Sequence, residues 1–289
     1  MNSKTTYRAA VVVALVCGIL PCLGYAVEIS EESTSANEVR EASSNESESS
    51  VSVSVGFDYS ASQNGTNRAS RSLNVPVILS YDTNNFGFSL TVPYLRQTGP
   101  AGTFAGQRIR PVGSATRTIS ESGLGDITGA VTGNLINDDG TGISVDLKGE
   151  IKFATADQSK GLGTGKNDYS VEVAVNQDYN TFGVSGTLGY SVLGSPGFVV
   201  VSGVKQNIIF NNVFYGSLGA SYKMTGSTKA ELLFNKQQVS EIEGFQQKDI
   251  TANLDYKLSK VTSLQIYVLK GLAEGSPDWG SGASVSASF

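Results

Sequence analysis

The chain has 289 residues, a formal net charge of -5, a hydrophobic content of 39%, 33 glycines and no histidine. This composition suits neither a dense soluble core nor a bundle of membrane helices, and the acidic charge argues against nucleic acid, whose phosphates need clustered Lys and Arg. Because histidine usually moves protons near neutral pH and binds metals, we expect no enzyme, no catalytic residues, no cofactor and no metal site.

The N-terminus has the features of an export signal. Lys4 and Arg8 precede an apolar run over residues 9–20, which is too short for a spanning helix. Small residues follow, as a signal peptidase requires. We therefore predict that residues 1–26 are a cleaved signal peptide, which also contains both cysteines of the chain.

The next segment, residues 27–50, is mostly Ser, Glu and Asn and has almost nothing to bury, so we predict a disordered acidic periplasmic segment. From residue 51 the pattern changes, because Val51, Val53, Val55 and Phe57 alternate with small or polar residues. This period of two predicts a strand with one apolar face. The same alternation recurs in residues 73–81, 86–95, 124–136, 143–153, 169–179, 182–192, 213–223, 228–238, 249–258, 262–269 and 283–289.

The alternation predicts an all-β fold, an antiparallel up-and-down transmembrane β-barrel of about twelve strands over residues 51–289. Tight turns alternate with longer connections, as periplasmic turns and external loops do in such barrels. In a soluble sandwich the polar faces would instead meet bulk water. The export signal, the aromatic residues at strand ends and the terminal Phe289 favour the bacterial outer membrane. Residues 194–212 fit least well, since 198–201 could form an extra strand.

Charged side chains fall on the polar face of the predicted strands, where they would line the lumen. Such an interior is favourable only if it is wet or internally paired. We predict a water-filled path, with a salt-bridged plug as the alternative. The predicted pore-lining residues are Asp146, Lys148, Glu150, Lys152, Glu172, Asp178, Glu231, Asp249, Asp255 and Lys257.

The longest predicted connection, residues 96–123, is rich in arginine. It contains Arg96, Arg108, Arg110 and Arg117, with no acid before position 121. Folded inward, this loop would form a constriction whose field orients polar solutes. Folded outward, it would lie against anionic lipopolysaccharide, and both placements remain open.

Several motifs in order resemble one bacterial family. They are Gly123-Leu-Gly-Asp126, Lys152-Phe-Ala-Thr-Ala-Asp157, Gly161-Leu-Gly-Thr-Gly165, Leu188-Gly-Tyr190, Leu218-Gly-Ala-Ser-Tyr222 and Gly275-Ser-Pro-Asp-Trp-Gly280. Together, over residues 73–289, they resemble the phenol meta-pathway outer-membrane transporter family. The resemblance implies a barrel that moves small molecules, aromatic compounds among them. Where the family has Pro-Thr-Gly-Asp after the lysine, this chain has Ala154-Thr-Ala-Asp157, which predicts an altered loop.

The sequence therefore predicts an outer-membrane channel for passive uptake or efflux of small solutes. The expected partners are outer-membrane lipid and lipopolysaccharide, the small-molecule solute, and the barrel assembly machinery, which Phe289 would contact. The alternative is a structural or adhesive barrel with a plugged lumen. Because one fold can serve either role, only the modest loop lengths favour transport.

Overall fold

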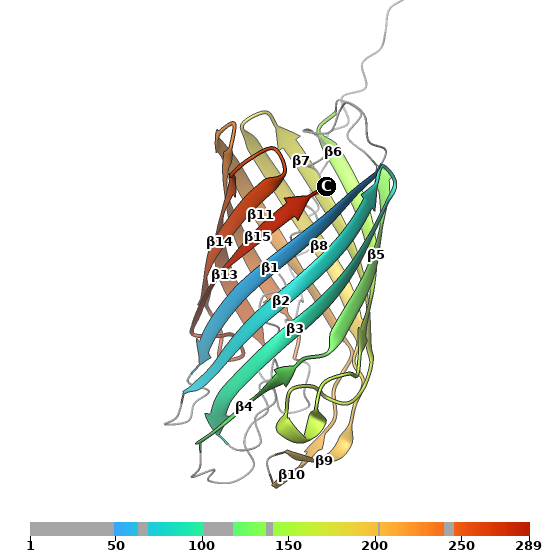
Figure 1. Ribbon diagram of the computed structural model, residues 1–289, viewed down its shortest axis with the longest axis vertical. Helices are drawn as coiled ribbons and strands as arrows, with labels where there is room; N and C mark the ends of the chain where they lie inside the picture. Colours follow the sequence, from blue (N-terminus) through green and yellow to red (C-terminus); the bar gives the residue numbers. More distant parts are fainter. Residues whose placement is uncertain (1–48, 63–68, 101–117, 137–140, 202, 240–245) are drawn as a thin grey trace, which may run out of the picture.

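The computed structural model describes residues 49–289, apart from 63–68, 101–117, 137–140, 202 and 240–245 (Figure 1). The predicted signal peptide and nearly all of the predicted acidic segment lie outside this part. The described strands are β1 (Ser49–Ser62), β2 (Ser70–Thr83), β3 (Phe86–Pro100), β4 (Thr118–Leu124), β5 (Ile127–Ile136), β6 (Ile143–Phe153), β7 (Asp168–Tyr179), β8 (Phe182–Val192), β9 (Gly197–Val201), β10 (Val204–Ile208), β11 (Val213–Thr225), β12 (Thr228–Gln237), β13 (Gln247–Lys257), β14 (Thr262–Gly271) and β15 (Trp279–Ser288). A short 3-10 helix, η1 (Gln158–Lys160), follows β6.

Thirteen of these strands form one antiparallel sheet that closes on itself, because β1 pairs with both β2 and β15. Figure 1 shows the first and last strands side by side. Both β4 and β5 pair with β3, one beyond the other, and so share one position in the wall. The barrel therefore has twelve positions around its wall, which confirms the predicted fold class.

The two ends of the barrel differ in their connections. At one end, here called the turn end, neighbouring strands are joined by short turns, and the C-terminus lies there too (Figure 1). The turn between β7 and β8 has only two residues, and Asn180 takes a φ of 46°, a left-handed conformation that asparagine tolerates better than most residues. The opposite end, here called the loop end, carries the longer connections and η1.

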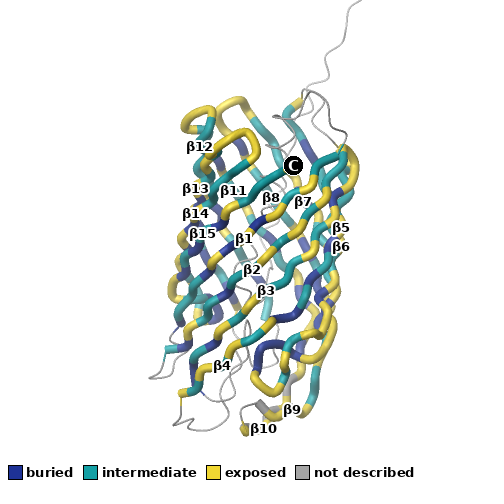
Figure 2. The backbone as a smooth tube through the Cα atoms, viewed as in Figure 1, coloured by how far each residue is buried: buried dark blue, intermediate teal, exposed yellow. Residues whose placement is uncertain are grey.

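Side chains alternate between an exposed outward face and a more buried inward face, as the banding in Figure 2 shows. Outward Val55, Leu79 and Leu218 are 49%, 50% and 60% exposed, whereas inward Ser54 and Ser221 are buried. Exposed apolar side chains in such number would be unfavourable in water but suit hydrocarbon. Exposed aromatic residues occur at strand ends, among them Tyr81, Phe86, Phe153, Tyr169, Tyr179, Phe182, Phe214, Tyr256 and Trp279.

In the described part of the chain, no helix has the length and apolarity needed to cross a membrane.

Two segments differ from the sequence prediction. Residues 124–136 were predicted as one strand, but the pairing with β3 shifts by one residue between β4 and β5. At this bulge the amide of Gly125 donates to the carbonyl of Pro93 (2.8 Å). The extra strand considered at 198–201 does form, as β9, but it pairs only with β10 in a separate hairpin and leaves the barrel count unchanged.

Candidate functional site

The structure places all ten predicted pore-lining side chains on inward positions. On β6 they alternate with an outward leucine and isoleucine that are 39% and 37% exposed. On β7, β12 and β13 the same alternation holds, with outward valine, phenylalanine and leucine side chains between them. Contact of these ten residues with a passing solute stays a prediction.

One side of the lumen wall carries interleaved charges. On β6, Lys148 Nζ lies 3.2 Å from Glu150 Oε2, and Lys148 stands opposite Glu172 of β7 in the strand register. Lys148 and Glu150 retain 25% and 13% side-chain exposure. On β12, Glu231 accepts a hydrogen bond from the amide of Asn253 (3.2 Å). This side, from β6 to β13, is the charged wall; its charges lie on β6, β7, β12 and β13, whereas β8 has none and β11 has only Lys223.

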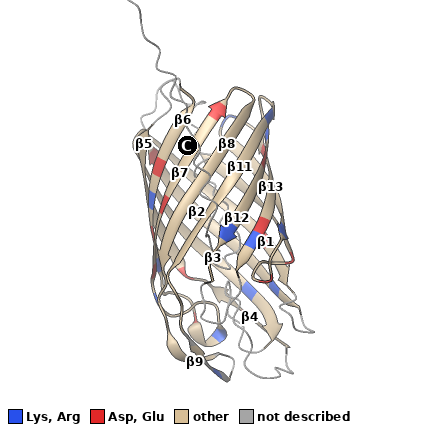
Figure 3. Ribbon diagram, turned by 180° about the vertical axis from the view of Figure 1, so that it is seen from behind, with Lys and Arg blue, Asp and Glu red and all other residues tan. Residues whose placement is uncertain are grey.

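The opposite side, from β14 through β15, β1 and β2 to β3, is the neutral wall. Its inward positions are mainly serine, glycine, proline and other small or apolar residues, and Ser54 and Ser286 are hydrogen-bonded across β1 and β15 (2.6 Å). Among the described residues, Asp58 and Asp82 are its only inward charges. Figure 3 shows how few charged positions there are and how acids and bases mix. The lumen is thus chemically two-sided.

Two tyrosines that sequence reasoning missed lie across the inner wall. Tyr267 of β14 stands opposite Gly282 of β15, which in turn stands opposite Asp58 of β1. Because Gly282 has no side chain, the Tyr267 hydroxyl reaches Asp58 Oδ1 and donates to it (2.9 Å). The amide of Asn74 donates to the other carboxylate oxygen (3.1 Å). Asp58 is therefore buried in the wall, with only 4% of its surface exposed.

The second tyrosine repeats this arrangement on the charged wall. Tyr215 of β11 stands opposite Gly189 of β8, which stands opposite Glu172 of β7. A Cβ on Gly189 would overlap the Tyr215 ring, so the glycine lets the ring lie flat toward Glu172. In the sequence, each tyrosine lies between two outward residues, so its inward position could be predicted. Their acidic partners, two strands away, depend on the register and could not be found from sequence.

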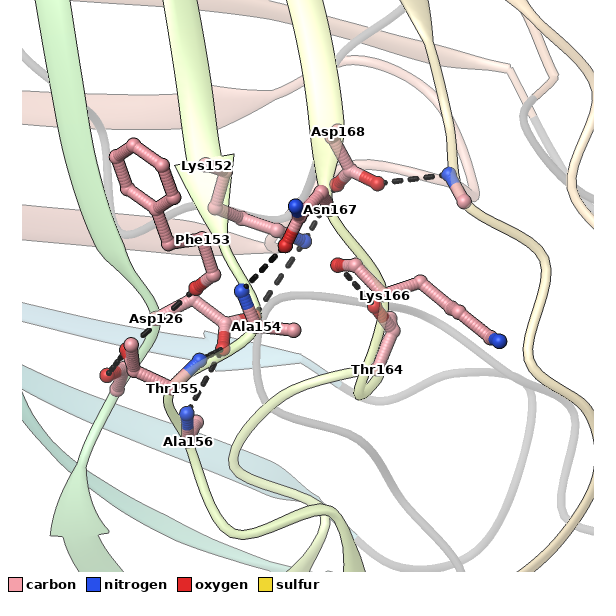
Figure 4. A network of polar contacts seen from close by, with 12 residues as sticks. Asp126, Lys152, Phe153, Ala154, Thr155, Ala156, Thr164, Lys166, Asn167 and Asp168 are labelled. Carbon is pink, nitrogen blue, oxygen red and sulfur yellow. Dashed lines mark hydrogen bonds and ion pairs between the residues drawn. The ribbon is translucent and has the colours of Figure 1, made fainter.

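At the loop end a buried ion network joins β6, β7 and the link between β4 and β5 (Figure 4). Lys152 of β6 forms ion pairs with Asp168 of β7 and with Asp126, which follows β4 (3.5 Å to Oδ2). The three side chains are at most 7% exposed. Burying these charges requires that each be paired and hydrogen-bonded, and the backbone supplies the remaining partners.

Those backbone partners come from the loop-end connections. The amides of Thr155 and Ala156 donate to Asp126 Oδ1 (3.1 and 2.9 Å), and the amide of Gly194 donates to Asp168 Oδ1 (2.8 Å). Figure 4 shows how the loop over residues 154–167 folds against these strands. Its Leu162 is 2% exposed and packs beside inward Gly123. The loop is thereby fastened to the inner side of the wall.

The motifs that carried the family resemblance converge on this network. Asp126 ends the first motif, Lys152 begins the second, and Gly163 lies in the third. A Cβ on Gly163 would lie only 2.7 Å from both carboxylate oxygens of Asp126, so the glycine allows the close approach. The loop that was predicted to be altered at Ala154 still packs here, with the Ala154 amide donating to Asn167 Oδ1 (2.9 Å).

Asp157 caps η1 at the exposed tip of this loop. Its carboxylate accepts hydrogen bonds from the hydroxyl and the amide of Ser159 (2.6 and 2.9 Å). These bonds, the hydroxyl's first, hold the pKa of the Asp157 carboxyl below its usual value. The cap is therefore present at neutral pH and is lost only as the pH falls through that lowered pKa.

The predicted arginine loop is shorter in the structure. β3 continues to Pro100, so Arg96 lies in a strand, exposed on the outward face with Tyr94, and its Nε donates to Ser120 Oγ (3.3 Å). The prediction that Arg96 belongs to an inward constriction is therefore wrong, because the strand pairing extends past it. Arg108, Arg110 and Arg117 lie outside the described residues, and their role stays a prediction.

Among the described residues, no cluster of three or more His, Cys, Asp or Glu side chains has the geometry to hold a metal ion.

Comparison with solved structures finds the same fold. An outer-membrane channel of the group COG4313 from Pseudomonas putida F1 superposes with a TM-score of 0.67 at 13% identity, over 85% of this chain and 97% of the other. Two more distant matches are a monoaromatic hydrocarbon channel, CymD (TM-score 0.49, 8% identity, 94% and 98% coverage), and the NanC porin (0.49, 12%, 83% and 98%).

Comparison by sequence gives a family. None of the curated proteins matches the chain. The family described as "Putative MetA-pathway of phenol degradation" matches residues 42–289, which include the whole described barrel and every motif of the resemblance. The chain belongs to this family.

Proposed function

We propose that the chain is a passive channel of the bacterial outer membrane that carries small solutes through its lumen. The observation that carries the proposal is the opposite chemistry of the two faces of one closed sheet. The outward face is apolar and exposed, as contact with hydrocarbon requires. The inward face holds charged side chains that keep part of their exposure, such as Lys148 at 25%, as contact with water requires.

The two-sided lumen suggests a class of solute. A small aromatic molecule with a polar group could place its ring against the neutral wall and its polar group toward the charged wall. The description of the family refers to phenol degradation, and phenol has this character. We therefore propose small polar aromatic compounds as the solutes.

The remaining partners are proposals from the sequence. Export would use the signal peptide over residues 1–26, and assembly in the membrane would use the C-terminal strand that ends in Phe289. Lipid and lipopolysaccharide would surround the outward face. An enzymatic role is not proposed, because the chain has no histidine to act as a general base near neutral pH.

Single-channel recording in planar bilayers tests the channel proposal. We expect discrete conductance steps from the purified, refolded barrel, and a reversible decrease in current when phenol is added on one side. Deleting residues 103–116 should enlarge the conductance if the predicted arginine loop narrows the lumen. A folded barrel that passes no current would contradict the proposal and favour a plugged structural barrel.

A further inference from the structure

Charges on the barrel strands are sorted by face and by end. On the described barrel strands every acid occupies an inward position, and every charged residue on an outward position is a base. All of these outward bases lie within the last few residues of their strands at the loop end. They are Arg71, Arg96, Lys236, Lys248 and Lys270.

Three of them lie together on adjacent strands, here called the lysine cluster. Lys236 of β12 stands directly opposite Lys248 of β13, and Lys270 of β14 is the diagonal neighbour of Lys248. Like charges directly opposite each other destabilise a sheet. Within the described chain no carboxylate lies within 4.0 Å of any of the three amino groups, and only Lys270 has a partner, the carbonyl of Asp278 (2.9 Å). Among the described residues the positive charge of the cluster is therefore unbalanced, and the two acids of the β12–β13 connection, Glu241 and Glu243, lie outside them.

The cluster borders the apolar outer surface. One step toward the turn end on the same face stand Phe234 and Val268, 40% and 58% exposed. Trp279 of β15, the single tryptophan of the chain, stands opposite Lys270 and packs on Tyr59 with ring centroids 5.3 Å apart. Tryptophan and lysine at this position mark the level of lipid headgroups.

We propose that the lysine cluster binds the phosphate groups of lipopolysaccharide in the outer leaflet. A phosphate between Lys236 and Lys248 would replace their repulsion by two attractions, and lysine is an established phosphate binder. The acyl chains would lie on the apolar surface below, beside Phe234 and Val268. The proposal rests on the proposed outer-membrane location, and it does not depend on transport.

Titration of the refolded barrel in neutral detergent with diphosphoryl lipid A tests the site. Binding is followed by native mass spectrometry and by the fluorescence of Trp279, which lies beside the cluster. We expect the triple variant K236Q/K248Q/K270Q to weaken binding at least about tenfold, since each base near an anionic lipid surface contributes about fivefold. Lipid A without its phosphates should bind the unmodified barrel about as weakly as diphosphoryl lipid A binds the variant.

The matched control is K223Q/K229Q/K257Q, which removes three lysines from inward positions at the turn end. Heat-dependent gel migration shows that each variant is folded. Equal weakening in both triple variants, or binding that ignores the phosphates, would overturn the proposal. Full displacement of lipid A by an equal concentration of inorganic phosphate would also overturn it, by assigning the cluster to a free anion.

Conductance measured on the same preparations separates this site from the channel proposal. A barrel that binds lipid A through the cluster but passes no current contradicts only the channel. A barrel that conducts but binds lipid A no better than the triple variant contradicts only the site.

Discussion

Single residues decide how polar groups are accommodated inside this wall. Tyr267 and Tyr215 each need a partner for the hydroxyl, because a buried hydroxyl without one is unfavourable. In both cases the partner is an acid two strands away, and the strand between contributes a glycine. The glycine therefore determines whether the tyrosine can reach the acid.

Replacing Gly282 with alanine should displace the Tyr267 ring and break its hydrogen bond to Asp58, because the new Cβ would overlap the ring. We expect a loss of about 1–3 kcal/mol in the free energy of unfolding, as overpacking usually costs. Urea unfolding in lipid vesicles measures it. G149A is the control, since nothing lies within 4 Å of a Cβ there. Equal stability of the two variants would show that Tyr267 moves aside freely.

Replacing Lys152 with methionine should destabilise the loop end, because it leaves the buried carboxyl groups of Asp126 and Asp168 without their cationic partner. Removing one member of a buried ion network typically costs about 3–5 kcal/mol. We expect lower unfolding stability and faster proteolysis within residues 154–167. K148M is the comparison, because Lys148 is 25% exposed and water can compensate for its loss. A similar small effect of both changes would show that the network is dispensable.

Sequence periodicity predicted the strands well because the inner and outer environments of the wall differ throughout the apolar belt. Residues 143–153, 169–179 and 182–192 were predicted within one residue of β6, β7 and β8. Periodicity failed at the bulge between β4 and β5, where one extra residue reverses the alternation and Gly125 bonds to Pro93. Periodicity also placed Arg96 in a loop. Beyond the apolar belt the outward residues of a strand need not be apolar, so the alternation that identifies a strand disappears there.

An arginine in place of Leu147 tests the assignment of faces at the scale of one strand. Leu147 is outward on β6 and 39% exposed, so the charge would enter hydrocarbon. The expected cost is about 2–4 kcal/mol near the bilayer midplane, measured by equilibrium unfolding from lipid vesicles. S170R, at an inward position on neighbouring β7, should cost clearly less. If the two changes cost the same, the faces are assigned incorrectly.

At the scale of the whole molecule, closure brings the two walls into opposition. Sequence reasoning predicted which side chains face inward, since that follows from parity along each strand. An up-and-down barrel keeps its strands in sequence order, so closure between β1 and β15 places β6 and β7 across the lumen from β14 and β15, and β12 across from β3. The resulting transverse asymmetry is a property of the closed barrel alone.

The acidic excess of the charged wall should make the barrel prefer cations, because fixed charges in a narrow lumen raise the concentration of the opposite ion. Replacing Glu172 and Glu231 with glutamine should lower the cation-to-anion permeability ratio by about twofold or more, and replacing Lys148 and Lys229 with glutamine should raise it. Reversal potentials across a salt gradient measure both. The shifts should grow at low ionic strength, since a field reaches only about 10 Å at 0.1 M salt.

The outward variant K236Q/K248Q is the control and should leave the ratio unchanged. If the inward acidic and basic variants shift the ratio in the same direction, the charges of this wall do not set the selectivity.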